Sequence, residues 1–521
     1  MKLLSHEIAE NGSLLGMDGS QQLKDDLRAG RIDADRLVDL VVTMQQQLQA
    51  AQQHLDVAQR RIAELEKLVP VAPPAKVDEP FSVQAEEKRQ EKAGKKKRKP
   101  KNKKRRGRFN TADKLKQVER TEQVYPEDVA PNECYLSHVR PVWRLEDGRA
   151  VLIAYEIYRG PKNQYGKIPG VLGRSEFGLE IVVTLAQLVY MVGLSFDKAC
   201  LVLSFFQNLK LRKSQADSLL RQLSRHWENE FEVLCTLLAN SLVVNTDETG
   251  WSLNSVWTFL SEKARVLLFG VHKDAETLKQ LLDPDTFAGL VISDDAAVYA
   301  HFTAAQKCWA HLLRKAIKLT LQDPENQEYR AFTDRLLEIY REACRVKRDG
   351  RLSDAGRARK VTDLEEKIYA LCGPMWLANL PPQEGLANDY RLLVKELMRL
   401  MLAEELFTFV TAQPVKQPNG ETKPVGATNN EAERTLRQPA EARKTGRTSK
   451  TLGGARRQTV LVSVLESLRL YLRTFTLSSV LAEIEQWTKA GKSCFTKLFE
   501  KLKLSHPSQP VLDQILPVPS G

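Results

Sequence analysis

Three acidic residues, far apart in the chain, have neighbours that would suit them to bind divalent cations. Asp247 and Asp294 each follow a short apolar run typical of a buried β-strand, and Glu433 follows two asparagines that could begin a helix. Phosphodiester chemistry by a pair of Mg²⁺ or Mn²⁺ ions requires carboxylates from separate elements, because hard oxygen ligands match these hard ions. We therefore expect all three residues to be metal ligands and catalytic groups, with two ions bound.

Both strand-end acids have a neighbour that could replace them. Glu248 competes with Asp247, since adjacent strand residues point to opposite faces, and we favour Asp247 because it lies nearer the apolar run. Asp294 could instead end its strand as an Asx-type cap, and Asp295 competes with it for a catalytic role. The sequence leaves these alternatives open.

Glu433 also has a simple structural interpretation. With Asn430 as the N-cap, it would occupy the third helical position, where a glutamate completes a capping box. It could also pair with Arg437 one turn later. Either contact would explain a glutamate here without any metal.

The order of elements around these acids indicates a fold. Strand-like runs at 242–249, 252–260 and 265–272 precede a helical run at 276–282, another strand-like run at 290–293 and a helix opened by 307–311. A β-β-β-α-β-α-β order, with acids at the ends of the first and fourth strands, is that of the ribonuclease H fold. We expect an α/β protein whose ribonuclease-H-like catalytic core is interrupted by an all-helical insertion, with an N-terminal coiled coil and a helical DNA-binding region.

The positive charge of the chain is concentrated in one segment. The 521 residues carry a net charge of +12, and the run at 95–108 contains eleven Lys or Arg, so the remainder is close to +1. No amphipathic apolar face accompanies this charge, which favours nucleic acid over a membrane surface as the partner. The residues expected to contact DNA here are Lys95, Lys96, Lys97, Arg98, Arg105 and Arg106.

Two further patterns concern assembly and DNA reading. Apolar residues at heptad spacing over 37–69 predict a coiled coil and a homodimer or higher oligomer, although a single packed amphipathic helix is the alternative. Two short helices at 196–206 and 214–223, joined by QNLKLRK, resemble a helix-turn-helix. Such helix pairs are common in α-rich regions, so the pattern alone does not establish DNA reading.

The cysteines and the apolar runs exclude several classes of protein. Seven scattered cysteines without a C-x-x-C pair suit free thiols, and Cys134 with His138 supplies only two candidate ligands for a metal. No run is long and apolar enough for a membrane span, and the first residues lack the apolar stretch of a signal peptide. We expect a cytoplasmic protein that does not contact a membrane.

These patterns predict nine segments. They are an N-terminal segment at 1–36, a coiled coil at 37–69, a linker with the basic run at 70–110, a small β-rich module at 111–175, a helical region at 176–240, the first part of the core at 241–318, a helical insertion at 319–428, the second part of the core at 429–476 and a C-terminal tail at 477–521.

Four motifs in this order resemble those of the insertion-sequence-66-type DDE transposases. They are DETGW at 247–251, VISD at 291–294, CWAH at 308–311 with Arg314 and Lys315, and NNEAER at 429–434 with Leu436, Arg437, Arg443, Lys444, Gly454 and Ala455. The resemblance implies a metal-binding triad of Asp247, Asp294 and Glu433. It also implies double-stranded DNA as the partner, with cleavage at the ends of a mobile element and strand transfer into target DNA.

The resemblance also assigns basic residues to DNA. His311, Arg314 and Lys315 would lie near the metal site and contact phosphates, unless Trp309 and His311 are core residues instead. Further phosphate contacts would come from Arg434, Arg437, Arg443 and Lys444, whose alternative is a solvated helix face.

The chain departs from the family in two places. The usual cysteine-rich segment is reduced to Cys134 and His138, and Thr428 replaces a common Asp. The expected function is that of a DDE transposase. The alternatives are a transposase-derived DNA-binding protein without catalysis and a ribonuclease-H-fold nuclease without strand transfer.

Overall fold

The computed structural model describes residues 42–43, 45–54, 56–57, 60, 114–378 and 381–517. The chain divides into two compact units, Met1–Arg106 and Gly107–Gly521. In the first unit, the described residues belong to the expected coiled coil and are helical and exposed. The rest of that segment and the basic run at 95–108 lie outside the described residues, so dimerisation through this helix stays a prediction.

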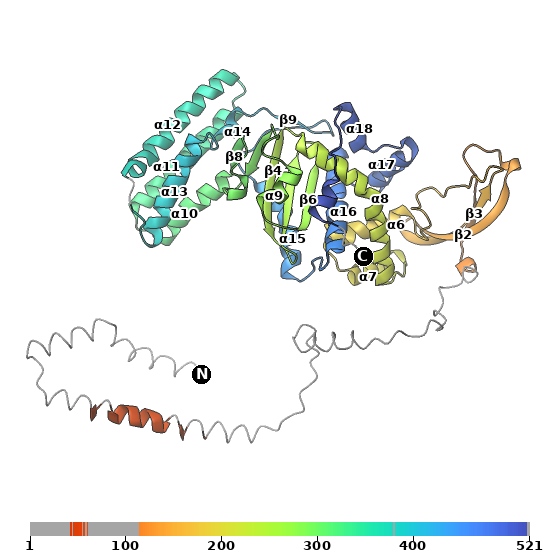
Figure 1. Cartoon of the computed structure of the whole chain (residues 1–521), viewed down its shortest axis with the longest axis horizontal. Coiled ribbons are helices and arrows are strands. Elements are labelled where there is room, and N and C mark those ends of the chain that lie inside the picture. The colour runs from red at the N-terminus through yellow and green to blue at the C-terminus, as the bar shows by residue number, and fades with distance from the viewer. Residues whose placement is uncertain are drawn as a thin grey trace, which may run out of the picture. The chain divides into compact units, whose positions relative to one another are not determined.

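A small three-stranded sheet begins the second unit (Figure 1). Its strands are β1 (Arg120–Val124), β2 (Tyr135–Glu146) and β3 (Arg149–Arg159), in the order β1-β3-β2. The antiparallel pair β2 and β3 is joined at Asp147 and Gly148, whose φ angles of 47° and 79° suit a tight hairpin turn. This sheet is tied to the next helix by an ion pair of 2.7 Å between Arg144 and Glu180.

Three helices follow, and one of them corrects the expected helix-turn-helix. They are α6 (Leu179–Ala186), α7 (Phe196–Gln207) and α8 (Lys213–Ala239). The second helix of the expected pair does not stop near residue 223, because its apolar face continues through Trp227, Phe231 and Leu234, all fully buried. α8 is therefore a 27-residue core helix that contacts α16 and α6, and the prediction of a short second helix was wrong.

The central sheet has five strands in the order β6-β5-β4-β7-β8. β4, β5 and β6 are antiparallel neighbours, whereas β4, β7 and β8 run parallel. The strands are β4 (Val243–Gly250), β5 (Ser255–Ser261), β6 (Arg265–Val271), β7 (Leu290–Ser293) and β8 (Ala305–Lys307). Helix α9 (Ala275–Leu281) and the 3-10 turn Ala297–Tyr299 lie in the connections. Because β4 and β7 are parallel, their carboxyl ends meet at one edge of the sheet.

The edge strand β6 is closed by a helix. Hydroxyl oxygens of Thr459, Ser463 and Ser467, spaced by one helical turn on α16 (Leu452–Tyr471), accept the backbone N–H groups of Phe269, Leu267 and Arg265 at 2.9–3.0 Å. These hydroxyls take the place of a sixth strand, so the outer edge of β6 cannot pair with another chain.

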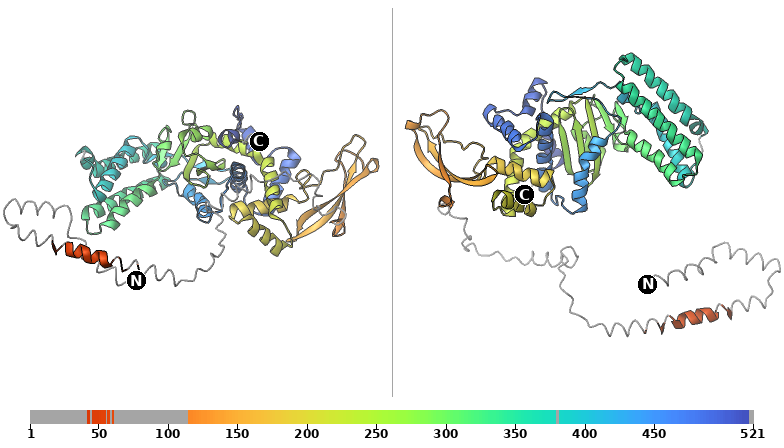
Figure 2. Two further views of the ribbon diagram at one scale, coloured as in Figure 1. Left: turned by 60° about the horizontal axis from the view of Figure 1, so that its bottom comes forward. Right: turned by 180° about the vertical axis from the view of Figure 1, so that it is seen from behind.

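The helical region has a core of its own beside β8 (Figures 1 and 2). It contains α10 (Trp309–Gln322), α11 (Gln327–Arg348), α12 (Asp354–Ala378), α13 (Gly385–Leu402) and α14 (Thr408–Thr411), followed by the hairpin of β9 (Val415–Lys416) and β10 (Thr422–Lys423). Helix α10 runs through the expected boundary at 318/319. Trp309 and Leu312 already pack into the helical core, so this region begins about ten residues earlier than the sequence suggested.

The chain then returns to the central sheet. Helix α15 (Asn430–Lys444) contacts β4 and β5, and α16 follows it. The segment expected to be a C-terminal tail instead forms α17 (Leu477–Ala490), α18 (Cys494–Lys501) and α19 (Val511–Ile515). Its buried apolar residues, among them Phe495 and Leu512, join the core around the sheet, which explains why this segment is folded.

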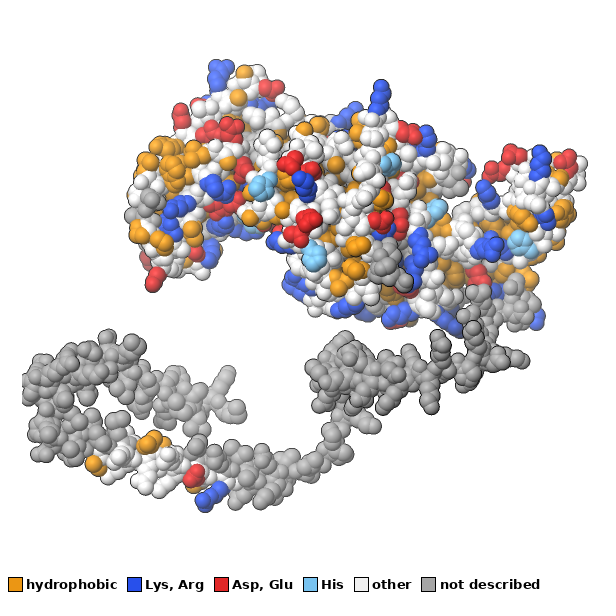
Figure 3. All heavy atoms as spheres, in the orientation of Figure 1, with side chains coloured by type: hydrophobic (Ala, Val, Ile, Leu, Met, Phe, Trp, Pro, Cys, Tyr) orange, Lys and Arg blue, Asp and Glu red, His pale blue; other side chains and the backbone are white. Residues whose placement is uncertain are grey.

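Charges of both signs are interspersed over the visible face of the second unit, as the near-neutral balance outside the basic run leads one to expect (Figure 3). Among the described helices, none combines the length and the apolar character that a bilayer crossing requires.

Candidate active site

Asp247 lies within β4, and Asp294 directly follows the neighbouring parallel strand β7, which ends at Ser293. The last paired residues of β4 and β7 are Asn245 and Ile292. Each aspartate lies two residues beyond its paired residue, and residues two apart on a strand share a face. The register of the sheet therefore places both carboxylates at the same edge and on the same side.

The two rival acids are already engaged. Glu248 accepts a hydrogen bond from the Tyr299 hydroxyl and forms an ion pair of 2.5 Å with Lys273, and its side chain is only 2 % exposed. Asp295 forms an ion pair with Arg399 on α13. Among the described residues, by contrast, neither Asp247 nor Asp294 forms an ion pair. On β4, alternation separates the engaged Glu248 from Asp247. Beyond the end of β7, the ion pair with Arg399 engages Asp295 and leaves Asp294 available.

The available aspartates are oriented by backbone hydrogen bonds. Asp247 accepts the N–H of Glu248 at 2.9 Å, and Asp294 accepts the N–H of Ala296 at 3.1 Å. The second contact is the Asx-type turn considered as an alternative for Asp294. It occupies one carboxylate oxygen and leaves the other for a ligand, so the turn and a metal-binding role are compatible.

Asn429 docks the helix that carries Glu433 onto the middle of β4. Its fully buried side chain donates to the Thr246 carbonyl at 2.7 Å and accepts from the Asn245 amide at 3.2 Å. The N–H of Glu433 bonds the Asn429 carbonyl one turn along α15. Glu433 is thereby held beside β4, which carries Asp247 three residues before its end at Gly250.

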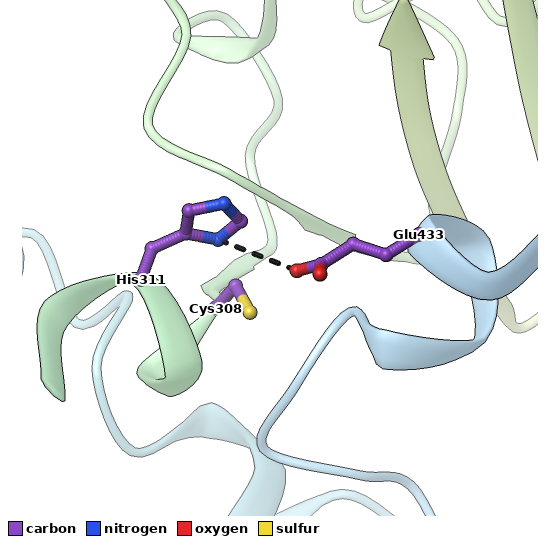
Figure 4. A group of neighbouring side chains, drawn as sticks. All are labelled: Cys308, His311 and Glu433. Atoms are coloured by element: carbon purple, nitrogen blue, oxygen red, sulfur yellow. Dashed lines mark ion pairs between the residues drawn. The ribbon is translucent and has the colours of Figure 1, made fainter. Parts of the chain in front are cut away.

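The start of α15 corrects the expected capping box. The N-cap is Asn429 rather than Asn430, and its side chain does not cap the helix. Glu433 also pairs with a residue other than Arg437. It accepts two hydrogen bonds of 3.0 Å from Arg314, and His311 Nδ1 lies 3.7 Å from its Oε1 (Figure 4). Neither structural alternative for Glu433 is therefore realised.

The electrostatics of Asp247 reflect other acids nearby, although the oxygens of Asp247, Asp294 and Glu433 do not all lie within 4.8 Å of one another in the described part of the chain. Burial, and then the negative charges of Glu248, Asp294 and Glu433, raise the pKa of Asp247 to about 7. When other acids raise the pKa of a carboxyl group, a cation bound between these acids stabilises the ionised form of that group. Oxygen donors from three elements, with excess negative charge, fit Mg²⁺ or Mn²⁺ as ligands.

Several groups at this site could not be assigned from the sequence. Tyr299 and Lys273 hold Glu248, and Asn429 holds α15, although each is separated from its partner by a connection or an insertion. Cys308 is buried beside them, and its sulfur accepts the N–H of Asn429 at 3.2 Å. The only sequence signal was the position of Asn429 next to the expected helix start.

The three residues of α10 that were expected to bind DNA, His311, Arg314 and Lys315, differ from one another in their contacts. Lys315 pairs with Glu396 on α13 at 2.6 Å, and Arg314 pairs with Glu433. Trp309 is fully buried and donates to the Leu406 carbonyl, as the core alternative required, whereas His311 Nδ1 has no hydrogen-bond partner. Both Arg314 and Lys315 are thus occupied by acids of the chain.

The α15 cations are more open. Arg434, Arg437 and Lys444 are exposed and spaced along one face of the helix, while Arg443 donates to the Gly250 carbonyl at 2.8 Å.

In the β-rich region, the Cys134 sulfur contacts the Ala130 carbonyl and His138 contacts Ser137. No third ligand joins that pair among the described residues, so zinc binding there gains no support.

The comparison with known families agrees with the motifs around this site. No curated relative matches the chain. The family described as Transposase IS66 family matches residues 174–457, which include Asp247, Asp294 and Glu433 and span more than half of the 521 residues. The chain therefore belongs to the IS66 transposase family.

Proposed function

We propose that this chain is a DDE transposase that cleaves the ends of a mobile element and joins them to target DNA, with Asp247, Asp294 and Glu433 as its catalytic acids. The observation that carries the proposal is the matched register of Asp247 and Asp294 on parallel strands, with Glu433 docked beside them by Asn429. The strand order β6-β5-β4-β7-β8 supports a ribonuclease-H-like core.

The three acids are the proposed ligands of two Mg²⁺ or Mn²⁺ ions. When bound, such ions activate the attacking oxygen and stabilise the leaving oxygen of a phosphodiester. The residues of the chain prepare this state. Asp247 must release its proton, and Glu433 must share or give up its two hydrogen bonds to Arg314. Freed from Glu433, the Arg314 guanidinium could bind a DNA phosphate.

The reaction consists of two displacements at phosphorus. In the first, water attacks at the element end, the P–O bond to the 3′ oxygen breaks and a free 3′-OH results. In the second, that hydroxyl attacks a target phosphodiester and a target 3′-OH leaves. The expected DNA contacts outside the acids are the exposed α15 cations Arg434, Arg437 and Lys444, together with the basic run at 95–108.

The decisive test is strand cleavage and joining with Mg²⁺ or Mn²⁺. Asp247→Asn, Asp294→Asn and Glu433→Gln should each abolish both steps and leave DNA binding intact. Asp295→Asn is the matched control, since it removes the adjacent carboxylate that pairs with Arg399, and it should retain cleavage. Full activity in any triad variant would remove that residue from the site, and cleavage without joined products would indicate a nuclease.

One observation favours a second candidate, a DNA-binding protein without catalysis. Arg314 neutralises Glu433 with two hydrogen bonds, which is how a disused catalytic acid could be stabilised. The two candidates differ in the response to Arg314→Gln. If Glu433 serves catalysis, both the wild-type protein and Arg314→Gln should cleave DNA. If both proteins bind DNA and neither cleaves it, the second candidate is supported.

A further inference from the structure

A second kind of metal-binding group lies against the acid cluster. The side chains of Cys308, His311 and Glu433 each offer one ligand atom, and these atoms all lie within 4.8 Å of one another. Figure 4 shows the three side chains around a shared space, two from the start of α10 and one from α15. This is the only group of three such residues among those that the structure describes.

The ligand atoms already lie together in the fold, and only Glu433 must exchange a partner, Arg314, to bind an ion. Within the described part of the chain, His311 Nδ1 has no hydrogen-bond partner, and it lies 3.7 Å from Glu433 Oε1, a separation that two ligands of one ion can have. The Cys308 sulfur is buried, and the N–H groups of Asn429, His311 and Ala310 direct hydrogen bonds to it. Burial nevertheless raises the pKa of the Cys308 thiol above its usual value, and these N–H groups only counteract that rise, so a bound metal ion would have to displace the proton.

We propose that Cys308, His311 and Glu433 form a binding site for Zn²⁺ or a similar transition-metal ion. A thiolate, an imidazole and a carboxylate match the ligand preference of Zn²⁺, while Mg²⁺ prefers oxygen ligands only. Three protein ligands leave a fourth position for water. The site differs from the proposed catalytic group because it contains Cys308 and His311 and excludes Asp247 and Asp294.

The shared glutamate gives this site a regulatory consequence, which rests on the proposed function. If Glu433 is held by Zn²⁺ together with Cys308 and His311, it is withdrawn from Asp247 and Asp294. Zn²⁺ should then inhibit Mg²⁺-dependent cleavage. Arg314 opposes Zn²⁺ binding because its guanidinium bonds both oxygens of Glu433. Arg314→Gln should therefore tighten Zn²⁺ binding.

The binding test uses the full-length protein without DNA and with Co²⁺ as a spectroscopic probe for Zn²⁺. We expect one Co²⁺ ion bound with thiolate-to-metal charge-transfer absorption, and competition by Zn²⁺. Cys308→Ser should remove this absorption and weaken binding by about tenfold or more. Cys134→Ser is the matched control and should change neither quantity, because among the described residues Cys134 of the β-rich region belongs to no group of three candidate ligands.

Three results would overturn the site. They are the absence of Co²⁺ binding, binding without charge-transfer absorption, and loss of the absorption in Cys134→Ser rather than in Cys308→Ser. If Cys308→Ser fails to fold, X-ray absorption of the Zn²⁺-loaded wild-type protein decides instead. One sulfur with nitrogen and oxygen ligands supports the site, and ligation by oxygen alone or by several sulfurs contradicts it.

A separate measurement addresses inhibition. Micromolar Zn²⁺ should inhibit Mg²⁺-dependent cleavage by the wild-type protein, and Cys308→Ser should be inhibited at least several-fold less. Equal inhibition of both proteins would contradict the regulatory consequence. The Co²⁺ spectra require no turnover, so they test the metal site independently of cleavage. A protein that shows the Co²⁺ absorption but does not cleave DNA would refute the proposed function and support the metal site.

Discussion

Asp247 and Glu431 are two largely buried acids with opposite electrostatic surroundings. Asp247 faces other acids, and burial together with Glu248, Asp294 and Glu433 raises its pKa to about 7. Burial also acts to raise the pKa of Glu431, but Lys423, Arg265 and Arg434 outweigh it and hold that pKa below its usual value. The charges of the neighbours, more than burial itself, distinguish an acid proposed to bind cations from a structural one.

The contrast extends along one helix. Glu431 and Glu433 lie two residues apart on α15 and face different partners. Glu431 bonds Arg265 on β6 at 2.9 Å and Lys423 on β10, which fastens the helix to the sheet and the hairpin. Glu433 faces the strand ends, Arg314 and His311. One turn of α15 thus carries a structural acid and a proposed catalytic acid.

The largest expected effect separates the two acids by activity. Asp247→Asn should lower Mg²⁺-dependent cleavage by about three orders of magnitude or more, since the loss of this proposed metal ligand would remove several kcal/mol of transition-state stabilisation. Glu431→Gln should retain cleavage at temperatures where it is folded. Single-turnover cleavage of an end-containing DNA measures both. Comparable losses in the two variants would break the distinction between them.

Stability should show the opposite ranking. Glu431→Gln removes the charge partner of Lys423 and leaves Arg265 with only its longer contact to Glu466 at 3.4 Å, so we expect a loss of roughly 1–3 kcal/mol in the free energy of unfolding. Glu433→Gln should cost less than about 1 kcal/mol, because its partner Arg314 is half-exposed. Denaturant titration of both variants provides the measurement. A larger loss for Glu433→Gln would assign that residue a mainly structural role.

The raised pKa of Asp247 predicts a pH dependence of stability in metal-free protein. Between the ordinary value of 3.8 and about 7, the unfolded chain releases this proton while the folded chain keeps it. Rising pH therefore favours unfolding in this window, by on the order of 2–4 kcal/mol in total, and has no further effect above it.

The matched variant for this pH effect is Asp247→Asn. It should lack this part of the pH dependence and be more stable than the wild-type protein above pH 7. Mg²⁺ affinity of the wild-type protein should rise with pH up to about 7, because the cation competes with the proton on Asp247. Thermal unfolding with EDTA and Mg²⁺ titration at several pH values measure both. Identical pH profiles for wild type and variant would contradict the assigned surroundings.

The smallest expected effect concerns the exposed cations of α15. Arg434→Gln, Arg437→Gln and Lys444→Gln should each weaken DNA binding several-fold and reduce the salt dependence by about one phosphate contact. Arg335→Gln is the control, because Arg335 pairs with Glu338 on the surface of α11. Fluorescence anisotropy at several salt concentrations, with EDTA present, measures the effect. Unchanged DNA affinity in all three variants would indicate that this face of α15 is solvated and does not contact DNA.

The local pattern of the sequence predicted much of the sheet. The bounds of β7 agree with the apolar run at 290–293, and the strands around Asp247 lie within a few residues of their expected positions. Such agreement is possible because a buried strand requires a continuous apolar run, and this requirement is visible in consecutive residues. The same reasoning failed for α8 and for 477–517, since burial against distant elements determines how far these helices extend.

The sequence by itself indicated which residues could do chemistry: three acids, each beside a recognisable strand or helix. Only the tertiary structure decided between neighbours. Register aligned Asp247 with Asp294, Tyr299 and Lys273 occupied Glu248, and Asn429 docked α15 across the helical region. The physical reason is distance along the chain, because these contacts join residues up to nearly two hundred positions apart and leave no local periodicity to read.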